Sequence, residues 1–148
     1  MVYSESYKLY FYLLERVDVF INGIESRFKK LSDEYFLNLI DFEEGDNIID
    51  CGAHLGELLY CFKDIKINYF AFEPSAKLCD CIEKNISINQ NNYLSYEVVN
   101  AALLDINDKV TVYIRDETGD TSLEADDLSK SLVIDSIRLD HYFKKNTF

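Results

Sequence analysis

The chain has 148 residues, a length that suits a single domain. Hydrophobic residues make up 48% of the sequence and aromatic residues 14%, which supports a hydrophobic core and argues against a disordered chain. Acidic residues number 27 against 15 basic ones, and the net charge of −12 disfavours binding to nucleic acid or to an anionic membrane.

Neither the amino terminus nor the cysteines indicate secretion. The first residues lack the basic start and the apolar run of a secretion signal, and no stretch approaches the ~18 apolar residues of a transmembrane helix. We therefore expect a cytoplasmic protein with reduced thiols and no membrane contact. The cysteines form no C-x-x-C pair, so we expect no metal site. They are Cys51, Cys61, Cys79 and Cys81.

Residues 1–44 are predicted to form an N-terminal helical segment. Apolar side chains recur on one helical face from about residue 4 to residue 22, and Gly23 is expected to end that helix. Ser32 suits the N-cap of a second, short helix that runs to Ile40. We expect this segment to cover a sheet edge or a neighbouring subunit.

The stretch from Asn47 to Gly56 organises the rest of the chain. Its apolar start is typical of a buried strand, and Cys51-Gly-Ala53 is typical of a tight turn. The apolar spacing that follows predicts a short helix over residues 55–63. A strand that turns on glycine into a helix presents main-chain N–H groups and the positive end of the helix dipole. We expect a nucleotide-like ligand there.

The glycine spacing narrows the choice of ligand. A dinucleotide site needs G-x-G-x-x-G and a P-loop needs Gly-Lys-Ser/Thr, and neither occurs here. The spacing of Asp50, Gly52 and Gly56 instead resembles motif I of the class I S-adenosylmethionine (SAM) methyltransferases. SAM carries no phosphate. Asp50 could meet its cationic end, directly or through water, and Gly52 would let the turn approach it closely.

A second anchor is Tyr69-Phe-Ala-Phe-Glu-Pro74, an apolar strand that ends in a carboxylate. Glu73 follows Gly52 by 21 residues, close to the offset at which an acidic side chain reaches a ribose hydroxyl pair. Pro74 ends the strand, and Ser75 can cap the next helix.

The remaining pattern predicts a parallel sheet followed by an antiparallel excursion. Strands are expected over 67–72 and 94–99 around a helix over 75–88, an alternation typical of right-handed βαβ units. The strand ends at Asp50, Glu73 and Asn100 would then line one rim. Beyond them, alternating apolar residues predict two further strands over 110–114 and 133–139, paired antiparallel.

Four segments together resemble the FkbM-type SAM-dependent methyltransferases over roughly residues 35–143. The resemblance implies an α/β, Rossmann-like class I fold with helices on both faces of the sheet, of which residues 45–148 would form a partial core. It also implies methyl transfer, usually to oxygen, with a small molecule or sugar as substrate. The segments are Ile48-Ile-Asp-Cys-Gly-Ala-His-Leu-Gly56, Phe70-Ala-Phe-Glu-Pro74, Val98-Val-Asn-Ala-Ala-Leu103 and Thr121-Ser-Leu123.

These motifs indicate a set of cofactor-binding positions and leave some roles open. His54 is either a loop residue whose main chain matters or a donor to the SAM carboxylate. The resemblance places Asn100 and Ala101 beside the adenine, although a capped turn of small residues is an equal interpretation. The resemblance places Thr121-Ser-Leu123 in a loop near the SAM pocket, but we favour an ordinary surface loop. The candidate positions are Asp50, Gly52, Ala53, His54, Gly56, Glu73, Pro74, Asn100 and Ala101.

The family pattern continues with a fourth core strand that carries an acidic motif near the transferred methyl group, and this sequence contains no such strand. We therefore expect either a fragment or a chain completed by a partner or a second copy, and we assign no catalytic residue. Two alternatives remain. One is a half-domain of an oxidoreductase that binds NAD or another nucleotide, and the other is a non-catalytic interaction domain.

Overall fold

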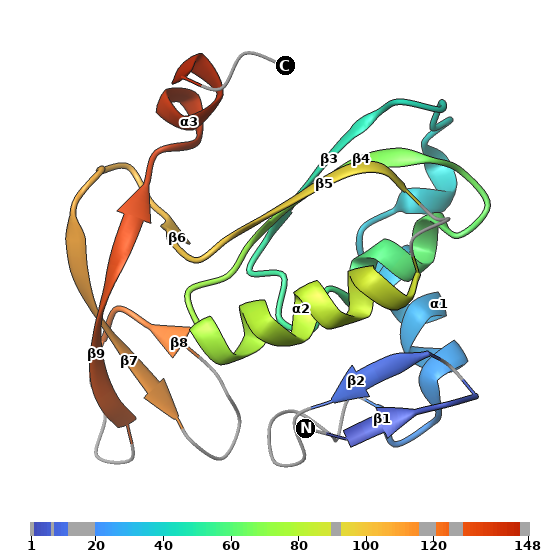
Figure 1. Cartoon of the computed structure of the whole chain (residues 1–148), viewed down its shortest axis with the longest axis horizontal. Coiled ribbons are helices and arrows are strands. Elements are labelled where there is room, and N and C mark those ends of the chain that lie inside the picture. The colour runs from blue at the N-terminus through green and yellow to red at the C-terminus, as the bar shows by residue number, and fades with distance from the viewer. Residues whose placement is uncertain are drawn as a thin grey trace.

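A computed structural model describes residues 2–6, 8–11, 20–89, 93–115, 121–124 and 129–145. Over these ranges the chain is a mixed α/β protein with a small parallel sheet, a second sheet of mainly antiparallel strands, and an N-terminal hairpin (Figure 1). None of the helices in the described ranges has the length and apolar character needed to cross a membrane.

The parallel sheet follows the predicted order of strands. It consists of β3 (Asn47–Cys51), β4 (Ile67–Phe72) and β5 (Tyr93–Val99), arranged β3-β4-β5 with every pairing parallel. β4 has the predicted bounds, and β5 begins one residue earlier than predicted. The continuous apolar runs suit strands that are covered on both faces.

Helices cover both faces of this sheet. On one face, η3 (Glu57–Phe62) and α2 (Ala76–Ile88) pack their apolar side chains on Tyr69 of β4. On the other face lies α3 (Leu139–Lys145), whose Tyr142 ring meets the Phe72 ring edge-on at 5.1 Å. The sequence did not predict α3, because the apolar alternation of the preceding strand continues into its first residue, Leu139.

The element after the motif I turn is a 3₁₀-helix and begins later than predicted. Gly56 has a φ of +72° and ends the turn, and the Leu59 N–H donates to the Gly56 carbonyl at 3.2 Å, a three-residue spacing. This short 3₁₀-helix replaces the expected helix over 55–63.

The antiparallel excursion is confirmed and is larger than expected. β7 (Lys109–Arg115) pairs antiparallel with β9 (Ser129–Ile137) in a sheet ordered β6-β9-β7-β8 (Figure 1). The two short strands were not predicted, because two residues carry no periodic signal. They are β6 (Ala102–Leu103) and β8 (Thr121–Ser122).

The prediction of a helix over residues 4–22 is wrong where the structure describes that segment. Two strands, β1 (Val2–Ser4) and β2 (Leu9–Phe11), form an antiparallel hairpin instead. Residues 12–19 of the predicted helix lie outside the described ranges. The Tyr and Phe residues of this segment, which we counted on the apolar face of a helix, also favour strands. The contact of β2 with α2 selects the hairpin.

The next helix also has different bounds. α1 spans Ile24–Glu34, so Gly23 precedes this helix, and Ser32 lies inside α1 instead of capping a later one. Gly23 has a φ of +90°, which suits a residue at a chain reversal. η2 (Leu37–Leu39) follows as a single 3₁₀ turn. Burial of Ile24 and Leu31, seven residues apart on one face, fixes the helix.

Asn85 of α2 attaches the hairpin to the core. Its side chain is 1% exposed, and its Oδ1 accepts the Tyr10 N–H at 2.6 Å while its Nδ2 donates to the Leu55 carbonyl at 2.8 Å. One amide therefore satisfies main-chain groups from β2 and from the segment before η3. A buried amide with both ends paired is costly to replace.

We predict that Asn85→Leu lowers the free energy of unfolding by roughly 2–4 kcal/mol, because it leaves two buried main-chain groups unpaired. Chemical denaturation measures this loss. Ser87→Leu, at an exposed position of the same helix, is the control and should change stability by less than about 0.5 kcal/mol. Equal effects of the two substitutions would show that Asn85 has no anchoring role.

Candidate functional site

A cavity of about 560 Å³ lies at the carboxyl ends of β3 and β4. This is the side of a parallel sheet at which ligands bind in open α/β folds. Apolar side chains form most of its wall, and His54 and Glu73 supply the ionisable groups together with the Cys51 thiol. The lining residues are Cys51, Gly52, His54, Phe72, Glu73, Pro74, Leu78, Ala101, Ala102, Leu103, Leu104, Val112, Ser122 and Leu123.

Glu73 holds the rim of this cavity together. Its side chain is 5% exposed, and its Oε1 and Oε2 accept the N–H groups of Ser75 and His54, both at 2.9 Å. Its own N–H donates to the Val99 carbonyl at 3.0 Å. Asn100 Nδ2 donates to the Glu73 carbonyl at 3.0 Å, so residue 73 connects the ends of all three parallel strands.

The main-chain N–H groups of the turn after β3 are largely used within the protein. Gly52 and Ala53 donate to the Phe72 carbonyl at 2.8 and 3.1 Å, and Gly56 donates to the Ala53 carbonyl at 2.7 Å. The expectation that this turn offers free N–H groups to a ligand is therefore wrong for these residues and for His54. The turn lacks the row of free donors that a pyrophosphate requires.

The two glycines of the motif have different roles. Both have positive φ angles, +79° for Gly52 and +72° for Gly56. A Cβ at Gly52 would meet no heavy atom within 4 Å, so this position leaves open space at the cavity wall. A Cβ at Gly56 would lie 3.1 Å from Ile82 Cγ2, so Gly56 serves the packing of the turn against α2.

His54 is buried in the cavity wall without a hydrogen-bond partner for its ring. It is 9% exposed, and neither ring nitrogen has a hydrogen-bond partner among the residues that the structure describes. The nearest acidic atom is Glu57 Oε2, 3.6 Å from Nδ1, which is too long for a hydrogen bond. Its φ of +52° is unusual for a residue other than glycine. An unpaired buried ring in a strained turn is typical of a site that receives a ligand.

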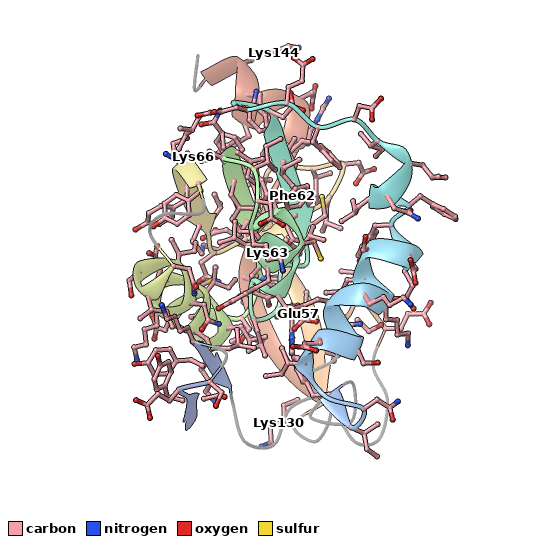
Figure 2. All side chains as sticks on the ribbon, turned by 90° about the vertical axis from the view of Figure 1, so that its right-hand side faces the viewer. Glu57, Phe62, Lys63, Lys66, Lys130 and Lys144 are labelled. Atoms are coloured by element: carbon pink, nitrogen blue, oxygen red, sulfur yellow. The ribbon has the colours of Figure 1, made fainter. Side chains whose placement is uncertain are left out.

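Arg27 of α1 neutralises the charge behind His54. Its Nε donates to Glu57 Oε1 at 2.7 Å, and its Nη2 contacts the same oxygen. Figure 2 shows Glu57 beside α1. Burial by itself would raise the pKa of Glu57, but His54 and Arg27 outweigh it and hold that pKa below its ordinary value. Glu57 is therefore a buried carboxylate.

Asp50 lies behind the cavity and does not line it. It is 8% exposed, on the face of β3 toward η3, and accepts a hydrogen bond from the Tyr69 hydroxyl. Burial raises the pKa of Asp50 to about 6, and the nearby Glu57 and Glu73 add to the rise, while the Tyr69 bond opposes it. The predicted contact of Asp50 with the cationic end of a ligand is not visible in this arrangement.

The structure brings together five of the nine predicted positions. Gly52, His54, Glu73, Pro74 and Ala101 line the cavity. The other four are close by: Asp50, Ala53 and Gly56 pack behind the turn, and Asn100 lines a neighbouring cavity that shares Ala101.

The sequence interpretation missed part of the wall. Ser122 and Leu123 line the cavity, although we interpreted their segment as a surface loop. The motif Thr121-Ser-Leu123 was the available signal. Ala102 and Leu103 of β6 belong to another segment of the resemblance. Val112 of β7 carried no such signal, because only the fold brings it next to the turn after β3.

Comparison of the chain with family models, with curated proteins and with solved structures found no match in any of the three.

We predict that Asp50→Asn increases stability at neutral pH. The pKa of Asp50 is raised, so the folded state binds its proton more tightly than the unfolded state. The carboxyl group therefore lowers the free energy of unfolding as the pH rises from about 4 to about 6. The variant should gain up to about 3 kcal/mol over the wild type across this window, with no difference below it. Denaturation at a series of pH values measures the difference.

Tyr69→Phe provides the opposite test of the same carboxyl group. Loss of the hydroxyl removes the hydrogen bond that lowers the pKa of Asp50, so the destabilisation by Asp50 should grow and extend above pH 6. If Asp50→Asn and the wild type keep a constant difference in stability from pH 4 to pH 7, this account of Asp50 is wrong.

Proposed function

We propose that the cavity at the ends of β3 and β4 binds SAM, and that the protein takes part in methyl transfer to an oxygen atom of a small molecule or sugar. One observation carries this proposal. The Glu73 carboxylate lies in the wall of an otherwise largely apolar cavity together with the His54 ring, whose nitrogens form no hydrogen bond among the described residues. The parallel order of β3 and β4, joined by a turn on glycine and a short helix, is compatible with a Rossmann-like methyltransferase and supports the proposal.

The wall of the cavity suits the parts of SAM. A carboxylate at the end of the second parallel strand is placed to accept hydrogen bonds from a ribose diol, as Glu73 is. The apolar side chains around Leu103 and Leu123 suit an adenine ring, and His54 can pair with the carboxylate of the amino-acid end. The open space at Gly52 admits the ligand close to the turn.

The main-chain N–H groups of the turn after β3 already donate within the protein, which favours SAM over a dinucleotide. Pyrophosphate binding depends on several free main-chain donors, and the N–H groups of Gly52, Ala53, His54 and Gly56 all donate within the protein. A ligand without phosphate requires no such donors. This argument weakens the NAD-binding alternative independently of the glycine spacing.

When bound, SAM supplies a methyl group made electrophilic by its sulfonium. The residues of this chain would bind and orient it: Glu73 at the ribose, His54 at the amino-acid end, and the apolar wall by excluding water. Asp50 contributes from behind by its bond with Tyr69, which fixes the end of β3. We assign no base for the acceptor hydroxyl.

We predict that S-adenosylhomocysteine, the product form of the cofactor, binds saturably to the purified chain in a calorimetric titration. Glu73→Gln should weaken binding about tenfold or more, because it removes a charged acceptor. Glu83→Gln, at an exposed position of α2 outside the cavity, is the matched control and should bind like the wild type.

NAD, titrated into the wild type under the same conditions, should not bind. This comparison needs no variant, so it remains informative if Glu73→Gln fails to fold. A folded wild-type chain that binds NAD but not S-adenosylhomocysteine would overturn the proposal in favour of the nucleotide-binding alternative. A chain that binds neither would favour the interaction domain.

A further inference from the structure

The outer edge of β3 has no strand beside it within the described ranges. β3 pairs only with β4, through bonds that begin where Asn68 donates to the Asp46 carbonyl and end where Gly52 donates to the Phe72 carbonyl. In a parallel ladder alternate residues bond to opposite sides. The N–H and C=O groups of Asn47, Ile49 and Cys51 therefore face away from β4.

The side chains of β3 show that this edge belongs to a buried sheet. Ile48 packs on the core beneath α2 and η3, while Ile49 packs on the cluster of Phe70, Phe72 and Tyr142 on the opposite face. Each face of the strand therefore carries an isoleucine that is partly buried against the core. Strands of this kind are normally paired on both edges, because an open edge leaves main-chain donors and acceptors available to another chain.

The segment that leads into β3 carries exposed apolar side chains. Leu37 and Phe42 anchor it on the core cluster that also holds Ile48, and Figure 2 shows it running along the side of the sheet on which β3 lies. Its large apolar side chains are between 51 and 76% exposed. They are Tyr35, Phe36, Leu39 and Ile40.

Charge indicates what kind of chain fits there. Residues 35–46 contain four acidic side chains and no lysine or arginine, in a protein with a net charge of −12. Two copies of this chain paired along β3 would bring these acidic segments together, and like charges oppose such pairing. A segment with basic residues at its ends would be attracted.

We propose that the outer edge of β3 binds an extended segment of a different polypeptide, which adds to the sheet as a strand. The segment has alternating apolar side chains and lysine or arginine at its ends. Main-chain bonds to Asn47, Ile49 and Cys51 would supply affinity, and its apolar side chains would cover those of residues 35–40. This inference is independent of the cofactor, and its test requires none.

The probe is an array of synthetic peptides of about ten residues, the length of a long strand. Each has an alternating Val-Thr or Ile-Thr core with two lysines at each end. Peptides with the same cores and glutamates at the ends are the matched controls. Fluorescence anisotropy with the full chain should show saturable binding of lysine-flanked peptides that weakens as salt is raised, and no binding of the glutamate set.

Two substitutions at one exposed position locate the contact. Asn47→Pro removes an N–H that faces the open edge and no bond to β4, so it should weaken the best peptide about fivefold or more. Asn47→Ala keeps the N–H and should bind like the wild type. Hydrogen exchange followed by NMR supplies a second readout in the wild type. The amides of Asn47, Ile49 and Cys51 should exchange more slowly when the peptide is bound.

Three results would each overturn the inference. The first is an array in which lysine-flanked peptides bind no better than the glutamate set. The second is binding that leaves exchange at Asn47, Ile49 and Cys51 unchanged. The third is a stable homodimer in light scattering that Asn47→Pro disrupts, because a second copy of the chain would then occupy this edge.

Discussion

The bonds of Glu73 are the constraint on which the rest of the site depends. Its carboxylate accepts main-chain N–H groups from the loops after β3 and β4, and Asn100 after β5 bonds to its carbonyl. A buried carboxylate is costly unless its lone pairs are satisfied, and here main-chain donors satisfy part of them. Glu73 therefore joins the ends of three strands through its side chain and main chain, and its carboxylate places a negative charge in the cavity wall.

The residues around His54 show how buried charged groups are arranged next to Glu73. Asp50, Glu57 and Glu73 lie near one imidazole, and Arg27 is the cation that contacts Glu57. Burial, with the charges of Glu57 and Glu73 added to it, raises the pKa of Asp50, whereas His54 and Arg27 hold the pKa of Glu57 below its ordinary value. Within the described part of the chain the His54 ring has no hydrogen bond, although the main-chain N–H groups of Gly52, Ala53, His54 and Gly56 all donate.

Elements that local patterns specify were predicted well. β4 was predicted with its observed bounds, because its apolar run ends at Glu73-Pro74, and a proline ends a strand wherever the chain goes next. The antiparallel pair of β7 and β9 followed from their alternation. The rule that strand ends of a parallel sheet share one rim predicted a common site for Asp50, Glu73 and Asn100, and this holds in part. Glu73 lines the cavity, Asn100 bonds to its carbonyl and lines a neighbouring cavity, and Asp50 lies behind.

Elements that depend on distant contacts were predicted poorly. The N-terminal hairpin is selected by Asn85, which lies 75 residues from Tyr10, and no local pattern carries that information. α1 begins before the suggested Ser32 cap, because the burial of Ile24 outweighs a cap preference of about 1 kcal/mol. Asp50 was expected at the ligand, whereas its side chain accepts a bond from the Tyr69 hydroxyl. Tyr69 lies opposite Ile48 on the neighbouring strand, and a diagonal bond of this kind is invisible in the sequence.

NMR of the His54 side chain in protein labelled with ¹⁵N at histidine tests the central claim most directly. The ring nitrogens form no hydrogen bond among the described residues, and we propose that the amino-acid end of the cofactor accepts one. On titration with S-adenosylhomocysteine the His54 ring nitrogen signals should shift and saturate, while those of His141, outside the cavity, stay unchanged. His54 signals that remain unmoved at concentrations where calorimetry reports full binding would contradict the account, because the ligand would then occupy a different site.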